Sequence, residues 1–269
     1  MKIWINGNLR HDQQKTLAGG DLSAAFRGGV YETIAVRNGQ PKLLSLHLAR
    51  LRRGLVRLQC DLEYSDEQLT LALADTVNAN ALTNAWTRIV VAPQGLYGLQ
   101  PSTPVVIITA VALPDRSTPL RLALSPFRRN PYSAMREIKA ATWIENDLIT
   151  NEAKQSGFDG ALLLDTAGFV SECPNANVFF VLDGQLCTPS LSTGCLAGVV
   201  REFLCSQLPV REVEITTSEF SQATEMFVTS AISGVQPVAS VQLANDAQVQ
   251  FAPTAGEFTQ QAQTLYANA

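Results

Sequence analysis

Apolar positions along the chain repeat with two different periods, and polar turn sequences separate the segments. Short apolar stretches flank Asn6-Gly7, and others flank Asn38-Gly39. Both dipeptides favour the positive φ angles of tight turns, so each predicts a β-hairpin. Leucines three and four residues apart predict a helix over Ser45–Leu58. The capping-box sequence Ser65-Asp-Glu-Gln68 predicts a second helix that continues to about Ala79.

The rest of the chain alternates between predicted strands and helices. Continuous apolar runs at Thr87–Ala92 and Val105–Ala112 are typical of buried strands. The pattern breaks at Pro114–Pro119, which predicts a linker between a smaller N-terminal domain, 1–114, and a larger C-terminal domain, 120–269. In the second domain we expect strands at 120–125, 161–165, 177–182, 185–188, 213–215 and 226–229, and helices at 144–155, from about 198, and at 255–266. The pattern therefore predicts a mixed α/β fold with two lobes, and clefts between lobes often bind ligands.

Composition and charge exclude several classes of protein. A net charge of −4 over 269 residues gives no basic surface for nucleic acid. The five cysteines form no CxxC pair and His11 and His47 are the only histidines, which argues against a metal site. Reduced thiols and a start without a secretion signal favour the cytoplasm. No apolar run approaches the roughly 20 residues that span a bilayer, so we expect no membrane partner.

Lys139 differs from the other four lysines because hydrophobic residues surround it, in Glu137-Ile-Lys139-Ala-Ala-Thr-Trp-Ile144. Burial lowers the pKa of an amine and makes it a base or a Schiff-base nucleophile. A lysine that extends its ammonium group from the end of an element into solvent is the simpler alternative. The immediate sequence favours that alternative, so the case for chemistry depends on residues further along the chain.

Downstream, Glu172 lies between a turn and the apolar strand that ends at Phe180. A carboxylate in such a position needs a cationic or proton-donating partner, and a pyridinium nitrogen is one. The alternative is a glutamate at a strand end in solvent.

Two segments of small residues offer groups that suit a phosphate. Gly194–Arg201 contains a turn that leads into a helix, and Thr229-Ser230-Ala231 ends a strand. A glycine-rich helix start exposes backbone N–H groups, here those of Gly198, Val199 and Val200. Each segment also has a common structural explanation, an ordinary helix start and an ordinary junction between strand and loop.

The order of lysine, carboxylate and glycine-rich helix start resembles the fold-type IV pyridoxal-phosphate enzymes. These are the branched-chain and D-amino-acid aminotransferases and aminodeoxychorismate lyase. The resemblance covers nearly the whole chain, and it includes Trp4–Gly7, Gly28–Ile34 and Leu43–Leu51 as well as the segments above. It implies a two-lobed fold like that of D-amino-acid aminotransferase, with pyridoxal 5'-phosphate between the lobes, and a homodimer.

The resemblance also implies a role for each matching residue. Lys139 would bind the cofactor as a Schiff base and move protons, and Glu172 would pair with the pyridine nitrogen. Tyr31 would face the substrate, although a core aromatic residue is an equal alternative. The remaining matches would bind the cofactor phosphate: Arg50, the helix start at Gly198 with the amides of Val199, Val200 and Ala231, and Ser230.

Residues near the cofactor positions favour 4-amino-4-deoxychorismate lyase, which yields 4-aminobenzoate and pyruvate for folate biosynthesis. Glu172-Cys173-Pro-Asn-Ala176-Asn177 is similar to the lyases, and Ala231 stands where transaminases often have threonine. A branched-chain or D-amino-acid aminotransferase is the alternative. A protein that binds cofactor without turnover is a third class, against which the presence of both Lys139 and Glu172 argues.

Two departures from the family pattern affect the substrate assignment. Ala92–Gly98 lacks an arginine that relatives carry after the strand, where it would hold a substrate carboxylate. Trp143 falls near a position where some relatives place a tyrosine for the cofactor hydroxyl.

Overall fold

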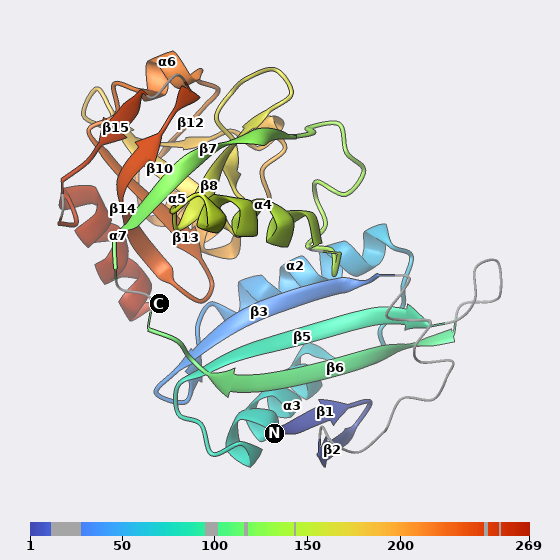
Figure 1. Ribbon diagram of the computed structural model, residues 1–269. Coiled ribbons are helices and arrows are strands. Elements are labelled where there is room, and N and C mark those ends of the chain that lie inside the picture. The colour runs from blue at the N-terminus through green and yellow to red at the C-terminus, as the bar shows by residue number, and fades with distance from the viewer. Residues whose placement is uncertain (12–27, 95–101, 116–117, 143, 245–246, 253) are drawn as a thin grey trace. The chain divides into compact units, whose positions relative to one another are not determined.

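The chain separates into two compact units, 1–114 with 138–142, and 115–137 with 143–269. The computed structural model describes residues 1–11, 28–94, 102–115, 118–142, 144–244, 247–252 and 254–269 (Figure 1). The segment with Lys139 belongs to the first unit, although the sequence division at the linker puts it in the second domain. Residues 95–98 and Trp143, on which both departures from the family pattern fall, lie outside the described residues.

The described strands of the first unit form one antiparallel sheet in the order β2-β1-β6-β5-β3-β4 (Figure 1). Both predicted hairpins are confirmed, because Asn6 and Gly7 have φ angles of 43° and 93°, and Asn38 and Gly39 have 50° and 75°. The strands are β1 Lys2–Ile5, β2 Asn8–His11, β3 Val30–Arg37, β4 Gln40–Pro41, β5 Ala85–Gln94 and β6 Ser102–Ala112.

Two helices, α2 Leu44–Arg57 and α3 Asp66–Ala79, pack on one face of this sheet (Figure 1). The predicted capping box is confirmed, since the Ser65 side chain accepts from the Gln68 N–H and the Gln68 side chain from the Ser65 N–H. At Gly54 a Cβ atom would lie 2.8 Å from Val30 Cγ1, so glycine lets α2 approach β3 closely.

Residues 87–92 and 105–112, predicted as buried strands, lie in β5 and β6, and their burial differs between the two faces. Ile89 and Ile108 are fully buried with the helices, whereas Trp86, Arg88 and Val90 on the opposite face of β5 are only half-buried. Side chains of a strand alternate between faces, and α2 and α3 cover one face of this antiparallel sheet.

The described strands of the second unit form a mixed sheet in the order β12-β11-β10-β13-β14-β7-β8, with β9 beside β10 and β15 beside β14. Pairing is parallel for β11 with β12, β14 with β7 and β7 with β8, and antiparallel elsewhere. The strands are β7 Leu120–Arg129, β8 Gly160–Asp165, β9 Glu172–Cys173, β10 Ala176–Leu182, β11 Gln185–Pro189, β12 Arg211–Val213, β13 Glu225–Ser230, β14 Gly234–Gln242 and β15 Gln248–Gln250. The pattern did not predict β14, because Pro237 removes a backbone donor and disfavours a central strand.

The helices of the second unit are α4 Ile144–Gln155, α5 Val199–Gln207, α6 Thr217–Phe220 and α7 Glu257–Asn268, with a 3₁₀ turn at Leu191–Thr193. A core of Leu162, Phe180, Phe220 and Val228 covers one side of β10 and β13. On the other side the rings of Phe179 and Phe227 stack with their centroids 5.0 Å apart. No helix in the described part of the chain is long and apolar enough to cross a membrane.

Candidate functional site

The position of Lys139 is fixed by backbone pairing with the beginning of β3. The Tyr31 N–H donates to the Lys139 carbonyl at 3.0 Å, and the Ala141 N–H donates to the Gly29 carbonyl at 2.8 Å. Lys139 Nζ lies 4.5 Å from the centre of the Tyr31 ring. Ile138 next to it packs into the core of the first unit. The structure therefore brings together two of the predicted site residues, Lys139 and Tyr31.

Arg50 lies on the buried side of α2, in a cluster with Glu32 of β3 and His47 of α2. Arg50 Nε donates to Glu32 Oε1 and Arg50 Nη2 donates to Glu32 Oε2, each at 2.7 Å. His47 Nδ1 lies 2.6 Å from Glu32 Oε2. Burial raises the pKa of Glu32, but Arg50 and then His47 outweigh this and lower the pKa to about 2. Burial lowers the pKa of His47, so this cluster holds one carboxylate, one guanidinium and a neutral imidazole.

Glu32 and His47 were not predicted as site residues, although both lie in the segments that carry the resemblance. One signal was available in the sequence. Glu32 alternates with Val30 and Ile34 on β3, so it must face the core with them, and a carboxylate there needs a partner.

Arg88 is a second cation close to the ring of Tyr31. Cross-strand pairing of Tyr31 with Val90 and of Thr33 with Arg88 puts Tyr31 and Arg88 on the same face of the sheet. The Arg88 guanidinium carbon lies 5.4 Å from the centre of the Tyr31 ring and 5.7 Å from that of Trp86. The Tyr31 ring therefore has two cationic groups near it, the Arg88 guanidinium and the Lys139 amine.

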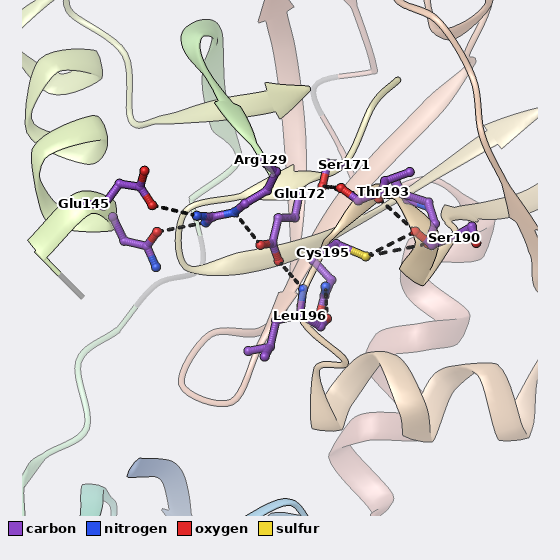
Figure 2. A network of polar contacts seen from close by, with 11 residues as sticks. Arg129, Glu145, Ser171, Glu172, Ser190, Thr193, Cys195 and Leu196 are labelled. Atoms are coloured by element: carbon purple, nitrogen blue, oxygen red, sulfur yellow. Dashed lines mark hydrogen bonds and ion pairs between the residues drawn. The ribbon is translucent and has the colours of Figure 1, made fainter. Parts of the chain in front are cut away.

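In the second unit Glu172 lies at the start of β9 and is buried, so the alternative of a glutamate in solvent is wrong. Glu172 Oε1 accepts from Arg129 Nε at 2.9 Å, and Oε2 accepts from the Leu196 N–H at 3.0 Å (Figure 2). Arg129 Nη2 in turn donates to Asn146 Oδ1 at 2.8 Å, and its Nη1 lies 3.3 Å from Glu145 Oε2. Figure 2 shows Arg129 lying between α4 and Glu172. The predicted need for a cationic partner is confirmed, and Arg129, which no sequence pattern indicated, is such a partner.

Helix α5 begins after Gly198, as predicted, and no side chain caps its first N–H groups. A Cβ atom at Gly198 would lie only 1.9 Å from Asn177 Oδ1. Asn177 Nδ2 donates to the Leu196 carbonyl at 2.8 Å. Glycine therefore lets the chain pass directly over Asn177, with the N–H groups of Val199 and Val200 at the open end of the helix.

Thr229 pairs with Asn177 across β13 and β10, so their side chains lie on the same face of the sheet. Thr229 Oγ1 is buried, and within the described structure it has no hydrogen-bond partner. In the turn that follows, Ser230 Oγ accepts from the Ser233 N–H at 3.1 Å. The Tyr266 hydroxyl of α7 donates to the Ala231 carbonyl at 2.9 Å and fixes that turn.

An anion fits this part of the second unit. A helix start without a side-chain cap attracts negative charge, and a buried hydroxyl without a partner is costly unless a ligand or water binds it. The buried carboxylate of Glu172 fits a protonated ring nitrogen. The groups found here, donors at one end and the carboxylate acceptor at the other, therefore suit the two polar ends of pyridoxal phosphate. Among the described residues no cluster of three or more His, Cys, Asp or Glu side chains is arranged to hold a metal.

Comparison with known proteins gives several matches of full length. Aminodeoxychorismate lyase of Bacillus subtilis is 26% identical over 98% of this chain and 93% of its own. D-alanine aminotransferase of Bacillus licheniformis is 27% identical over 100% of this chain and 96% of its own. The crystal structure of branched-chain aminotransferase from Thermoproteus uzoniensis superimposes with a TM-score of 0.87 at 26% identity, covering 100% of this chain and 94% of that one.

The expected fold class, mixed α/β like the class IV aminotransferases, is confirmed by these structures. The family described as amino-transferase class IV matches residues 29–241, a range that contains every predicted site residue. The chain therefore belongs to the class IV aminotransferase family, and it is an enzyme that depends on pyridoxal 5'-phosphate.

Proposed function

We propose that the protein is a 4-amino-4-deoxychorismate lyase that releases 4-aminobenzoate and pyruvate, and that it works as a cytoplasmic homodimer. The observation that carries this proposal is the segment Glu172-Cys173-Pro-Asn-Ala176-Asn177, which is similar to that of the lyases. In this segment Cys173 is buried and Asn177 holds the backbone before α5, so both residues help to shape the surroundings of Glu172. The full-length similarity to the lyase of Bacillus subtilis supports the same activity.

In this proposal Lys139 would hold the cofactor through its carbonyl group and would move the substrate proton. Glu172 pairs with the pyridine nitrogen, and Tyr31 faces the substrate. The donors for the phosphate are Arg50, the helix start at Gly198, the N–H groups of Val199, Val200 and Ala231, and the hydroxyl of Ser230. When bound, pyridoxal phosphate supplies an electron sink. Removal of the ring proton by Lys139 and departure of enolpyruvate leave an aromatic ring, and enolpyruvate takes up a proton to become pyruvate.

Arg88 supports a substrate with carboxylate groups. Aminodeoxychorismate carries two carboxylates, and Arg88 is a guanidinium on the sheet face that carries Tyr31. A planar guanidinium binds a carboxylate through two parallel hydrogen bonds. We assign to Arg88 the role of holding one substrate carboxylate, because the arginine that relatives carry after the strand is missing from this sequence.

A branched-chain or D-amino-acid aminotransferase is the second candidate. The sequence Ile144-Glu-Asn-Asp-Leu148 that follows Lys139 resembles transaminases as much as lyases. The similarity to D-alanine aminotransferase, and to the branched-chain enzyme in structure, favours the same reaction class. Lys139 and Glu172 would serve both reactions, since each needs the same base and the same ring nitrogen.

The test is incubation of the purified protein with pyridoxal phosphate and aminodeoxychorismate. We expect 4-aminobenzoate, followed by its fluorescence, and pyruvate in equal amounts. The Lys139→Ala variant should lose turnover by at least about a thousandfold, because no other group replaces the amine as nucleophile and base.

Borohydride reduction of the yellow protein should place the cofactor label on Lys139. A protein that carries cofactor but gives no 4-aminobenzoate, and instead transfers amino groups from L- or D-amino acids, would establish the second candidate. A Lys139→Ala variant with normal rates would contradict the role of this lysine.

A further inference from the structure

We propose that His47 and Glu32 are positioning residues that hold the Arg50 guanidinium in the orientation in which it receives the cofactor phosphate. The inference rests on the phosphate role proposed for Arg50. The inference adds two residues, Glu32 bonded to Arg50 and His47 bonded to Glu32. In this inference both act on the cofactor only through Arg50.

The bonds of the cluster determine where its protons lie. Glu32 is ionised above its pKa of about 2, so its carboxylate accepts hydrogen bonds and donates none. The 2.6 Å contact with His47 therefore requires the proton on His47 Nδ1. Because His47 and Arg50 both donate to Glu32, the three side chains form a single hydrogen-bonded unit.

The geometry of this unit fixes the plane of the guanidinium. The Nε and Nη2 groups of Arg50 both pair with Glu32, one with each carboxylate oxygen, at 2.7 Å. This pair uses one edge of the guanidinium, and it prevents rotation about the last bonds of the side chain. An arginine loses rotamer entropy when it is fixed completely. In this fold much of that loss occurs when the protein folds, before any phosphate binds.

His47 adds a third hydrogen bond, and it restrains Glu32 rather than Arg50. His47 and Arg50 lie one helical turn apart on α2, on the buried side of the helix. Because His47 is 1% exposed and Glu32 is 0% exposed, water does not replace the bond when it is removed. Without it, Glu32 keeps its pair with Arg50 but loses one of its restraints, so the orientation of the pair, and with it that of the Arg50 guanidinium, is held less firmly.

The test measures the dissociation constants of two probes, pyridoxal 5'-phosphate and pyridoxal, which lacks the phosphate. The protein is freed of cofactor and titrated by absorbance. His47→Leu fills the space without a donor, whereas His47→Asn keeps an N–H close to the position of Nδ1. We expect His47→Leu to raise the dissociation constant of pyridoxal phosphate about tenfold and to leave that of pyridoxal within about twofold of the wild-type value. His47→Asn should restore most of the phosphate-dependent affinity.

An Arg50→Met variant separates this inference from the proposal on which it rests. If Arg50→Met loses affinity for both probes equally, the phosphate role of Arg50 is wrong. Arg50→Met could instead lose affinity for pyridoxal phosphate alone, and the phosphate role of Arg50 then stands. If His47→Leu in that case lowers the affinity for both probes or for neither, the positioning role of His47 is overturned. Circular dichroism checks the fold of each variant. Should His47→Leu not fold, His47→Ala takes its place, and equal affinities of His47→Ala and His47→Asn for pyridoxal phosphate overturn the inference.

Discussion

The side chain of Arg88 lies between the aromatic rings of Tyr31 and Trp86, on the sheet face that carries Lys139. Contacts of a guanidinium with ring faces limit its motion and leave its in-plane N–H groups to bind a planar anion. A lysine at this position would keep the charge but lose the two-pronged geometry. In our proposal Arg88 makes a substrate-carboxylate contact that the sequence motifs did not indicate.

We expect Arg88→Met to raise KM for aminodeoxychorismate by roughly tenfold to a hundredfold, because a charge-assisted pair is lost. Arg88→Lys should recover only part of the effect. The dissociation constant of pyridoxal phosphate should stay within about twofold of the wild-type value, since Arg88 has no role in cofactor binding in our proposal. Arg121→Met is the matched control, because Arg121 is exposed at the start of β7 in the second unit and pairs with Asp159. A variant with unchanged KM would exclude Arg88 from substrate binding.

Among the elements, α5 depends most on a single residue. Its N-terminus reaches Asn177 only because Gly198 has no side chain, and Asn177 is anchored on β10 and bonded to Leu196. The same glycine also leaves the helix start without a side-chain cap. Close packing and an open helix start therefore have the same cause.

Gly198→Ala should move Asn177, the start of α5, or both, because a Cβ atom has no room there. We expect a loss of about 1–3 kcal/mol in the free energy of unfolding, as for other overpacked sites. Cofactor affinity should fall about tenfold or more if Val199 and Val200 bind the phosphate, measured by titration with pyridoxal phosphate. Gly160→Ala is the control, since its Cβ would meet only a methyl group of Leu122, at 3.3 Å. Equal cofactor affinity in the two variants would contradict the role of this helix start.

The sequence predicted those elements that have a local cause. Turn dipeptides located two hairpins of the first unit, β1 with β2 and β3 with β4, and the Ser65 capping box located α3. Contacts between distant residues left no such signal. Arg129 reaches Glu172 across 43 positions of sequence, and only the folded sheet brings them together. Lys139, Glu172 and Gly198 were found through a resemblance. Glu32 and His47 beside Arg50, Arg88 beside Tyr31 and Arg129 beside Glu172 were identified from the folded structure.

At the scale of the whole molecule, the buried cluster of the first unit makes stability depend on pH. Glu32 has a pKa of about 2 in the folded protein, below its ordinary value of 4.5. The contribution of Glu32 to the free energy of unfolding is therefore present above pH 4.5, and it is lost as the pH falls through the folded pKa. The pKa of His47 is also lowered, chiefly by burial, so acid protonates the unfolded form first. Both groups act in the same direction, and acid destabilises the protein.

We expect the free energy of unfolding by urea to fall as the pH drops from 7 to 5, in the range where unfolded histidine takes up its proton. The His47→Asn variant should show a shallower decline over this range, because it lacks the titrating group. Below pH 4.5 both proteins should lose further stability, of which Glu32 accounts for roughly 3 kcal/mol. Both proteins are measured with the same excess of cofactor, so its own titration cancels. If the free energies of unfolding of the two proteins fall in parallel between pH 7 and 5, His47 does not contribute to the pH dependence of stability.

The segment 138–142 has a consequence for how the protein is made. Ribosomes deliver the chain from the N-terminus, and domains begin to fold as they emerge. The first unit stays incomplete while the next two dozen or so residues are added, because its last segment comes only with Ile138–Thr142. Until then the Tyr31 N–H and the Gly29 carbonyl lack the partners that Lys139 and Ala141 provide. Unpaired strand edges invite association with other chains. During synthesis, then, the stretch of β3 that pairs with Lys139 is a place where a nascent chain is open to wrong pairing, and arrival of the 138–142 segment closes it.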